Sequence, residues 1–301
     1  MRSNRVNRGV WTAVASILVA GCASHALPRG DPNNHAVAPD SLGVWMAQVR
    51  HLSSTAARQS DGTTTIEARD AGLRTALEAL KTSRTAAAHD RVAEAYRRTG
   101  ILDLAYEHYA AARDIDGRDA AAYAGLARIW RDWGLAELGL GDAKRAVYHA
   151  PASAAAHNTL GTLLYALGQT REARREFERA LALEPGAAYI WTNLCYERFQ
   201  AGDLRAAAAR CLRAIALDPD FRAAHNDLGL VYAAAGETTL AAAEFAATNA
   251  DAAAREFNIG IVMAAAGKYP EAAHAFETAE TLRPGWTIAA ERARQARRLA
   301  E

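Results

Sequence analysis

Apolar and small residues in the middle of this chain recur with the spacing of paired amphipathic helices. The clearest case is residues 154–187, where two stretches each keep such residues to one helical face. The residues on these faces are His157, Leu160, Gly161 and Leu164 in the first stretch and Ala173, Phe177 and Ala180 in the second. Gly168 between the stretches suits a left-handed turn, and Pro185 ends the second one. The pattern predicts one helix–turn–helix unit of 34 residues.

The same unit recurs at a nearly fixed period over residues 86–286. Its turn glycines are Gly100, Gly134, Gly168, Gly202, Gly236 and Gly267, spaced by 34 residues except for a last interval of 31. A small residue recurs in each first helix, as Ala93, Ala127, Gly161, Cys195, Gly229 and Gly260. A second one recurs in each second helix, as Ala105, Gly139, Ala173, Ala207, Ala241 and Ala272. Because one such unit cannot bury its apolar face alone, the units must stack into an all-α solenoid.

This pattern resembles the tetratricopeptide repeat family, which implies a right-handed α-solenoid. Six repeats are expected at residues 86–119, 120–153, 154–187, 188–221, 222–252 and 253–286. Gly139 and Gly141 lie inside the second helix of 120–153, where each costs about 1 kcal/mol against alanine, so this repeat is expected to be the weaker one. The repeat at 222–252 lacks its closing proline, which predicts a shortened second half.

Residues 1–21 are predicted to be a signal peptide rather than part of the fold. A basic start is followed by a short apolar run that ends in Val19-Ala20-Gly21-Cys22. This combination resembles the bacterial lipoprotein signal, which implies that Cys22 is lipidated and becomes the first residue of the mature protein. Ala23 in the next position implies the outer membrane and a periplasm-facing protein. An ordinary secretory signal or an uncleaved anchor is the alternative.

The segments that flank the repeats are expected to tether and cap them. Residues 22–40 contain three prolines and predict a flexible tether. Residues 41–85 predict a helical hairpin, either a diverged repeat or cap, or a separate hairpin that binds a partner. Residues 287–301 predict a C-terminal capping helix, and its outward arginines leave contact with anionic lipid as the alternative.

Composition and charge exclude some classes of function. A formal net charge of +1 over 301 residues gives no electrostatic footprint for a nucleic-acid partner. No catalytic constellation and no phosphate-binding glycine loop is visible, so the chain is expected not to be an enzyme and to need no cofactor. His89, His157 and His225 hold the fourth place of their repeats, which predicts packing histidines rather than a metal site. An enzyme or a metal protein stays as the competing hypothesis from another class.

Cys195 and Cys211 remain as an even pair once Cys22 is lipidated. They would face each other across one helical hairpin in an oxidising compartment, so a disulfide is one interpretation. Two buried thiols in small-residue positions are the other, and the sequence leaves both open.

The resemblance also implies that the first helices of the repeats line a concave groove. The groove residues carried over are Asn158, Tyr165, Tyr189, Asn193, Tyr196, Phe199, Asn226 and Asn258. The asparagines recur once per repeat and resemble the row by which some family members hold an extended peptide, because an amide can pair with both backbone groups. The alternatives are local structural bonds for the asparagines and packing between repeats for the aromatic residues.

The expected function is therefore a lipid-anchored scaffold that binds an extended protein segment in its groove. Lipid-anchored repeat proteins of this size resemble assembly factors of type IV or tight-adherence pili, which implies a role in assembling a pilus or secretion complex. The alternative is an envelope scaffold that recruits peptidoglycan or polysaccharide enzymes. The discriminating observation is which class of protein the groove captures.

Overall fold

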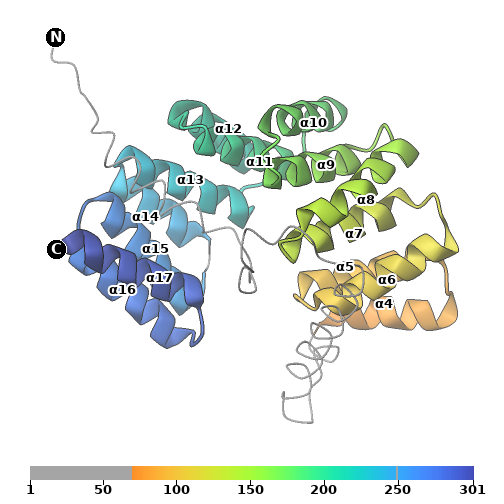
Figure 1. The fold of residues 1–301 in the computed structure, drawn as a ribbon, viewed down its shortest axis with the longest axis horizontal. Coiled ribbons are helices and arrows are strands. Elements are labelled where there is room, and N and C mark those ends of the chain that lie inside the picture. Colours follow the sequence, from red (N-terminus) through yellow and green to blue (C-terminus); the bar gives the residue numbers. More distant parts are fainter. Residues whose placement is uncertain (1–69, 249) are drawn as a thin grey trace. The chain divides into compact units, whose positions relative to one another are not determined.

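The computed structural model describes residues 70–248 and 250–301. The expectations for the signal peptide, Cys22, the tether and the first half of the N-terminal hairpin lie outside these residues. All regular structure within them is α-helical, which confirms the predicted all-α class (Figure 1). None of the described helices has both the length and the apolar run that crossing a bilayer requires. The described helices fall into two compact units that divide between Leu183 and Glu184.

The described part of the unit that ends at Leu183, from residue 70 onward, contains one leading helix and three helical hairpins. The leading helix is α4 (Ala71–Thr82), and it packs on α5. The hairpins are α5 (Ala86–Arg98) with α6 (Leu102–Ile115), α7 (Ala120–Asp132) with α8 (Ala136–His149), and α9 (Ala154–Ala166) with α10 (Thr170–Leu183). The first helices pack side by side, α5 on α7 and α7 on α9.

The unit that begins at Glu184 repeats this arrangement and ends in a single helix. Its hairpins are α11 (Ala188–Gln200) with α12 (Leu204–Leu217), α13 (Arg222–Ala235) with α14 (Thr238–Ala247), and α15 (Ala252–Ala265) with α16 (Tyr269–Leu282). Helix α17 (Thr287–Ala300) then packs on α16. Helix α14 has 10 residues where α12 and α16 have 14, as the shortened repeat predicts. Helix α15 begins one residue before the expected repeat start at 253.

Short polar residues start four of the six described first helices, and glycines turn the chain between the two helices of a hairpin. Ser153 Oγ accepts a hydrogen bond from the Ala156 N–H, and Asp251 Oδ1 accepts one from the Ala254 N–H, so each caps an open helix end. Gly168 has a φ of 74°, which a residue with a Cβ rarely adopts. The turn glycines of the other repeats share this conformation: Gly100, Gly134, Gly202, Gly236 and Gly267.

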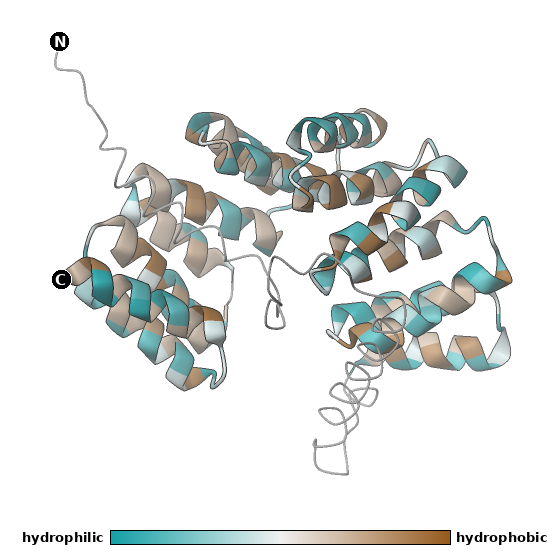
Figure 2. Ribbon diagram, viewed as in Figure 1, coloured by the Kyte–Doolittle hydropathy of each residue, from teal (hydrophilic) through white to brown (hydrophobic). Residues whose placement is uncertain are grey.

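The core lies between the two helices of each hairpin, where brown apolar faces meet and teal polar faces turn away (Figure 2). Glycines on first helices let aromatic rings from second helices approach closely. A Cβ added to Gly161 would lie 2.6 Å from Phe177, and the same contact joins Gly229 to Phe245. Phe177 is 2% exposed, so each ring fills the space left by the missing side chain.

Candidate functional site

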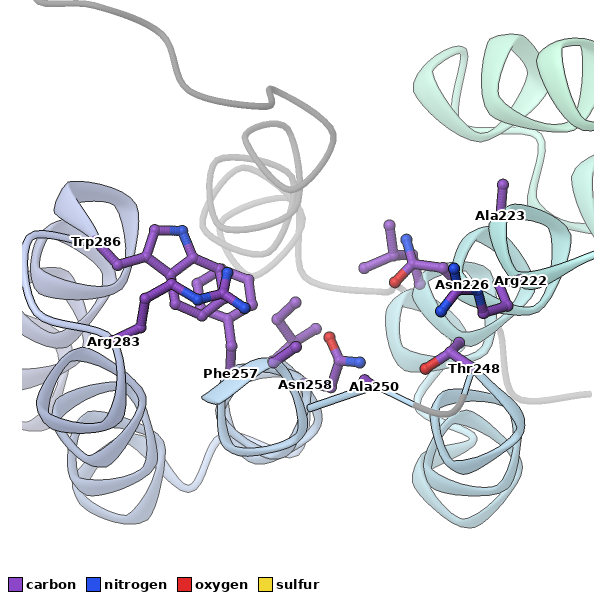
Figure 3. Close-up of a pocket in the computed structure, with 12 residues that line it drawn as sticks. Arg222, Ala223, Asn226, Thr248, Ala250, Phe257, Asn258, Arg283 and Trp286 are labelled. Atoms are coloured by element: carbon purple, nitrogen blue, oxygen red, sulfur yellow. The ribbon is translucent and has the colours of Figure 1, made fainter. Parts of the chain in front are cut away.

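A cavity of about 380 Å³ opens in the unit that begins at Glu184 (Figure 3). It lies where α13 and α15 face the turn between α16 and α17. The residues that line it are Arg222, Ala223, Asn226, Leu230, Thr248, Ala250, Ala254, Phe257, Asn258, Ile261, Arg283 and Trp286. Its size suits a small molecule or a few side chains of a protein segment. Two predicted groove residues, Asn226 and Asn258, are among them.

One side of the cavity is held in place by stacking and an ion pair. The Trp286 ring stacks on Phe257 with centroids 4.8 Å apart, and the Arg283 guanidinium lies 4.4 Å from the Trp286 centroid. Arg283 Nη2 also lies 2.5 Å from Asp251 Oδ2. The hydrogen bond from the Ala254 N–H is the main cause that lowers the pKa of Asp251; burial opposes it, and Arg283 adds to the lowering. Because these contacts exist before any ligand arrives, binding need not order this side.

Arg222 and Asn226, one turn apart on α13, line the opposite side of the cavity (Figure 3). Arg222 is exposed and forms no ion pair within the part of the chain that the structure describes. Among the described residues, the lining includes two arginines and no acidic side chain, which makes this part of the cavity electropositive.

The four predicted asparagines differ in what their side chains do. Asn158 and Asn193 each take part in an interaction within the protein. The amides of Asn226 and Asn258 make no hydrogen bond to any described residue, although Asn258 is only 9% exposed. Each of these two amides therefore keeps both donors and its acceptor for a ligand.

The predicted aromatic residues do not form one exposed row. Phe199 is 7% exposed and packs in the core of its unit, so the expectation that it is a groove anchor is corrected: it fills the space between helices. Tyr196 is half-buried against the same core. Tyr189 donates a hydrogen bond from its hydroxyl to Glu184 Oε2 at 3.1 Å, and burial followed by the Glu184 carboxylate raises its pKa to about 12. Tyr165 lies on α9 in the other unit and is half-buried.

The first helices of the unit that ends at Leu183 carry a network of charged side chains. Glu94 Oε1 lies 2.7 Å from Arg97 Nη2, and its Oε2 lies 3.2 Å from Arg128 Nη2. Tyr109 donates its hydroxyl hydrogen to Glu94 Oε2 at 2.7 Å. Burial raises the pKa of Glu94, but its bonds to Arg97, Arg128 and Tyr109 outweigh this and lower it to about 2. These side chains pair with one another, although Arg128 Nε is buried without a hydrogen-bond partner among the described residues.

The histidines at the fourth place of the repeats make structural bonds. His157 is 3% exposed; its Nδ1 lies 2.6 Å from Glu176 Oε2 and its Nε2 lies 3.0 Å from the Pro151 carbonyl oxygen. His225 makes the equivalent pair of contacts in its own repeat. Within residues 70–248 and 250–301, no group of three or more His, Cys, Asp or Glu side chains is placed to hold a metal ion.

Cys195 and Cys211 form a disulfide between α11 and α12. The sequence left open both a bond and two buried free thiols, slightly favouring the thiols, and the structure has the bond. Both residues are fully buried, so the bond lies inside the hairpin.

Sequence reasoning missed the part of the cavity that comes from outside the first helices. Carrying over first-helix positions found Asn226 and Asn258, but Arg283 and Trp286 lie between α16 and α17. Arg222 is the first residue of α13, outside the positions that the family pattern marks. A tryptophan just before the last helix was the one available signal.

Comparison with known proteins agrees with the all-α repeat fold. Models of the tetratricopeptide repeat match residues 154–187 and 196–256. No curated protein matches the sequence. Among solved structures, the chain resembles the APC/C Cut9–Hcn1 hetero-tetramer with a TM-score of 0.64 and 15% identity, covering 88% of this chain. The chain spans only 50% of that longer chain.

Two further structures are similar over most of their own length. PilW, a type IV pilus biogenesis factor, has a TM-score of 0.56 and 19% identity over 68% of this chain and 97% of its own. PilF of Pseudomonas aeruginosa has a TM-score of 0.51 and 19% identity over 73% of this chain and 97% of its own. At these identities the likeness is one of fold. The described residues thus have an all-α fold of stacked helical hairpins, and tetratricopeptide repeats are matched at residues 154–187 and 196–256.

Proposed function

We propose that this protein is a lipid-anchored, periplasm-facing scaffold that binds an extended segment of a partner protein and aids assembly of a pilus or secretion complex. The observation that carries the binding site is the cavity of about 380 Å³, in which the amides of Asn226 and Asn258 have no partner within the described chain. Extended backbone offers both donors and acceptors, and an unpaired amide satisfies one of each.

Two features support the location outside the cytoplasm. The sequence Val19-Ala20-Gly21-Cys22 after an apolar run has the form of a lipoprotein signal. The Cys195–Cys211 disulfide fits an oxidising compartment such as the periplasm. Replacing Cys22 with alanine is expected to abolish incorporation of labelled fatty acid and to release the protein from the outer-membrane fraction. Unchanged labelling and fractionation would overturn the anchor.

The pilus role is supported by the likeness in fold to PilW, together with the expected anchor. Affinity capture from detergent-solubilised envelopes tests it, with the wild-type protein and an Asn226→Ala/Asn258→Ala form as baits. We expect a pilus or secretion component that the double variant no longer retains. An Arg213→Ala bait is the matched control, because Arg213 is exposed on α12, away from the cavity lining.

The outcomes of this capture separate the two envelope functions. Peptidoglycan or polysaccharide enzymes retained in place of pilus components would favour the enzyme-recruiting scaffold. Equal capture by the wild-type and Asn226/Asn258 baits would remove the cavity from partner binding.

A further inference from the structure

We propose that the cavity selects an acidic partner segment, with a carboxylate bound at Arg222 and a neighbouring apolar side chain packed toward Phe257 and Trp286. This inference rests on the proposed function, and it names the chemistry of the segment and the residue that selects it.

The two arginines of the cavity differ in what remains for a ligand. Arg283 already pairs with Asp251 and stacks on Trp286, so its charge is largely neutralised. Arg222 has no acidic partner within the described chain and lies on the other side of the cavity. Since none of the described residues that line the cavity is acidic, a carboxylate arriving there meets an unbalanced positive charge at Arg222. Arg222 is therefore the selecting residue, and Arg283 is part of the wall.

The remaining lining suits an apolar side chain beside that carboxylate. Leu230, Phe257, Ile261 and Trp286 contribute apolar surface to the cavity. Figure 3 places Trp286 opposite Arg222 and Asn258 between them, so an extended segment that crosses the cavity meets charge, amide and ring in turn. A nucleic acid would also supply negative charge, but a formal net charge of +1 offers no wider basic surface to follow its backbone.

A displayed peptide library tests both the site and its selectivity. The probe is a library of random ten-residue peptides on phage, selected on the immobilised full chain and sequenced. We expect enrichment of Asp or Glu beside aliphatic or aromatic residues. For selected peptides, exchanging the acid for its amide is expected to weaken binding to wild-type protein about tenfold, as measured by fluorescence polarisation.

Two matched variants test whether Arg222 causes the difference in binding between acid and amide peptides. Against Arg222→Gln the acid and amide peptides should bind equally, whereas Arg213→Gln, which changes an exposed arginine on α12, should keep the tenfold difference. Discrimination that survives in Arg222→Gln would overturn the inference. Circular dichroism of both variants confirms that the helices are retained.

The failure of this inference differs from the failure of the proposed function. Selected peptides that need Asn226 but show no acid enrichment would overturn the acidic selectivity and leave the peptide site standing. A selection that yields no peptide sensitive to Asn226→Ala would overturn both.

Discussion

Cys195 and Cys211 are bonded at the two repeat positions where Gly229 and Phe245 pack together in the following repeat. Each pair lies 16 residues apart and joins the first helix of a hairpin to the second. In one repeat an aromatic ring lies against a glycine, and in the other a covalent bond between two small side chains spans the gap. The disulfide therefore takes the place of a packing contact.

Removing the disulfide is expected to destabilise its unit. Cys195→Ala with Cys211→Ala should lower the free energy of unfolding by about 3 kcal/mol, because the short loop between the cysteines is no longer closed in the unfolded chain. Urea unfolding of oxidised wild-type protein and of the variant measures the difference. Reductant should lower the stability of the wild-type protein and leave that of the variant unchanged.

Replacing the Cys195–Cys211 disulfide with a glycine and a phenylalanine tests whether the bond and the Gly229–Phe245 type of contact can substitute for each other. Cys195→Gly with Cys211→Phe recreates the pair found in the next repeat and is expected to be more stable than the double alanine form, with no response to reductant. A Gly/Phe form no more stable than the double alanine form would show that the two solutions are not interchangeable.

Glycines inside helices of this protein have opposite roles, which substitution by alanine should reveal. A Cβ at Gly161 would lie 2.6 Å from Phe177, so Gly161→Ala is expected to destabilise by about 1–2 kcal/mol despite the better helix propensity of alanine. No atom lies within 4 Å of a Cβ at Gly141, so Gly141→Ala should stabilise by about 0.5–1 kcal/mol. Thermal unfolding of both variants measures these changes in stability. Shifts of the unfolding temperature in the same direction for both variants would contradict the prediction.

The repeat architecture could be predicted because its signals are local and recur. The turn at Gly168 depends on one residue's backbone freedom, and Pro185 on one residue's steric effect, so each is visible without knowledge of neighbours. The weakness predicted at Gly139 stays a prediction, but the packing role of this glycine could not be predicted from the sequence. A Cβ there would lie 2.9 Å from the Ala127 carbonyl oxygen, so Gly139 is needed for close packing, which only the structure shows.

The site was less predictable because it depends on contacts between residues far apart in sequence. Position within a repeat placed both Asn226 and Asn193 on the groove face. Whether either side-chain amide interacts with another residue of the protein depends on the side chains packed around it, and only Asn193 has such an interaction among the described residues. The same positional rule placed Phe199 on the surface, although it packs in the core. Trp286 lies outside the repeat positions altogether, and its stacking on Phe257 has no sequence signature.

Asp90 makes the stability of its unit depend on pH. Its buried Oδ1 has no hydrogen-bond partner, and Asp119 lies nearby. Burial, followed by the Asp119 carboxylate, raises the pKa of Asp90 from 3.8 to about 7, while Arg128 opposes this effect. Because the folded state holds this proton more tightly than the unfolded chain, stability is full below about pH 4 and falls as the pH rises through 7.

Replacing Asp90 with asparagine should remove the loss of folding stability that the wild-type protein shows as the pH rises through 7. We expect the variant to be more stable than wild type by about 1–2 kcal/mol at pH 8, an amount reduced for the partial exposure of this side chain, and close to wild type at pH 4.5. Urea unfolding at both pH values measures the gap. Asp114→Asn is the control, because it changes an exposed carboxylate paired with Arg113. Its difference in stability from wild type should not increase with pH.

His225 is also expected to make folding stability fall as the pH rises, but over a narrower pH range than Asp90. Its Nδ1 lies 2.7 Å from Glu244 Oε2 and its Nε2 lies 2.9 Å from the Pro219 carbonyl oxygen, so both contacts are hydrogen bonds only when both ring nitrogens carry protons. Burial lowers the pKa of His225, but the bonds to Pro219 and Glu244 outweigh it and raise the pKa above 6.5. This stabilisation is therefore present below pH 6.5 and is lost as the pH rises through the folded-state pKa.

The tryptophan of the preceding repeat supplies the matched variant for this prediction. Trp191 donates its Nε1 hydrogen to the Pro185 carbonyl oxygen at 3.0 Å, which satisfies the same kind of carbonyl without a titrating group. His225→Trp is therefore expected to keep the bond to Pro219 and to lose about 0.5–1 kcal/mol less stability than wild type between pH 6 and pH 8. Unfolding at these two pH values measures the difference. Identical pH dependence in the two proteins would mean that the protonated ring of His225 adds nothing to the hairpin.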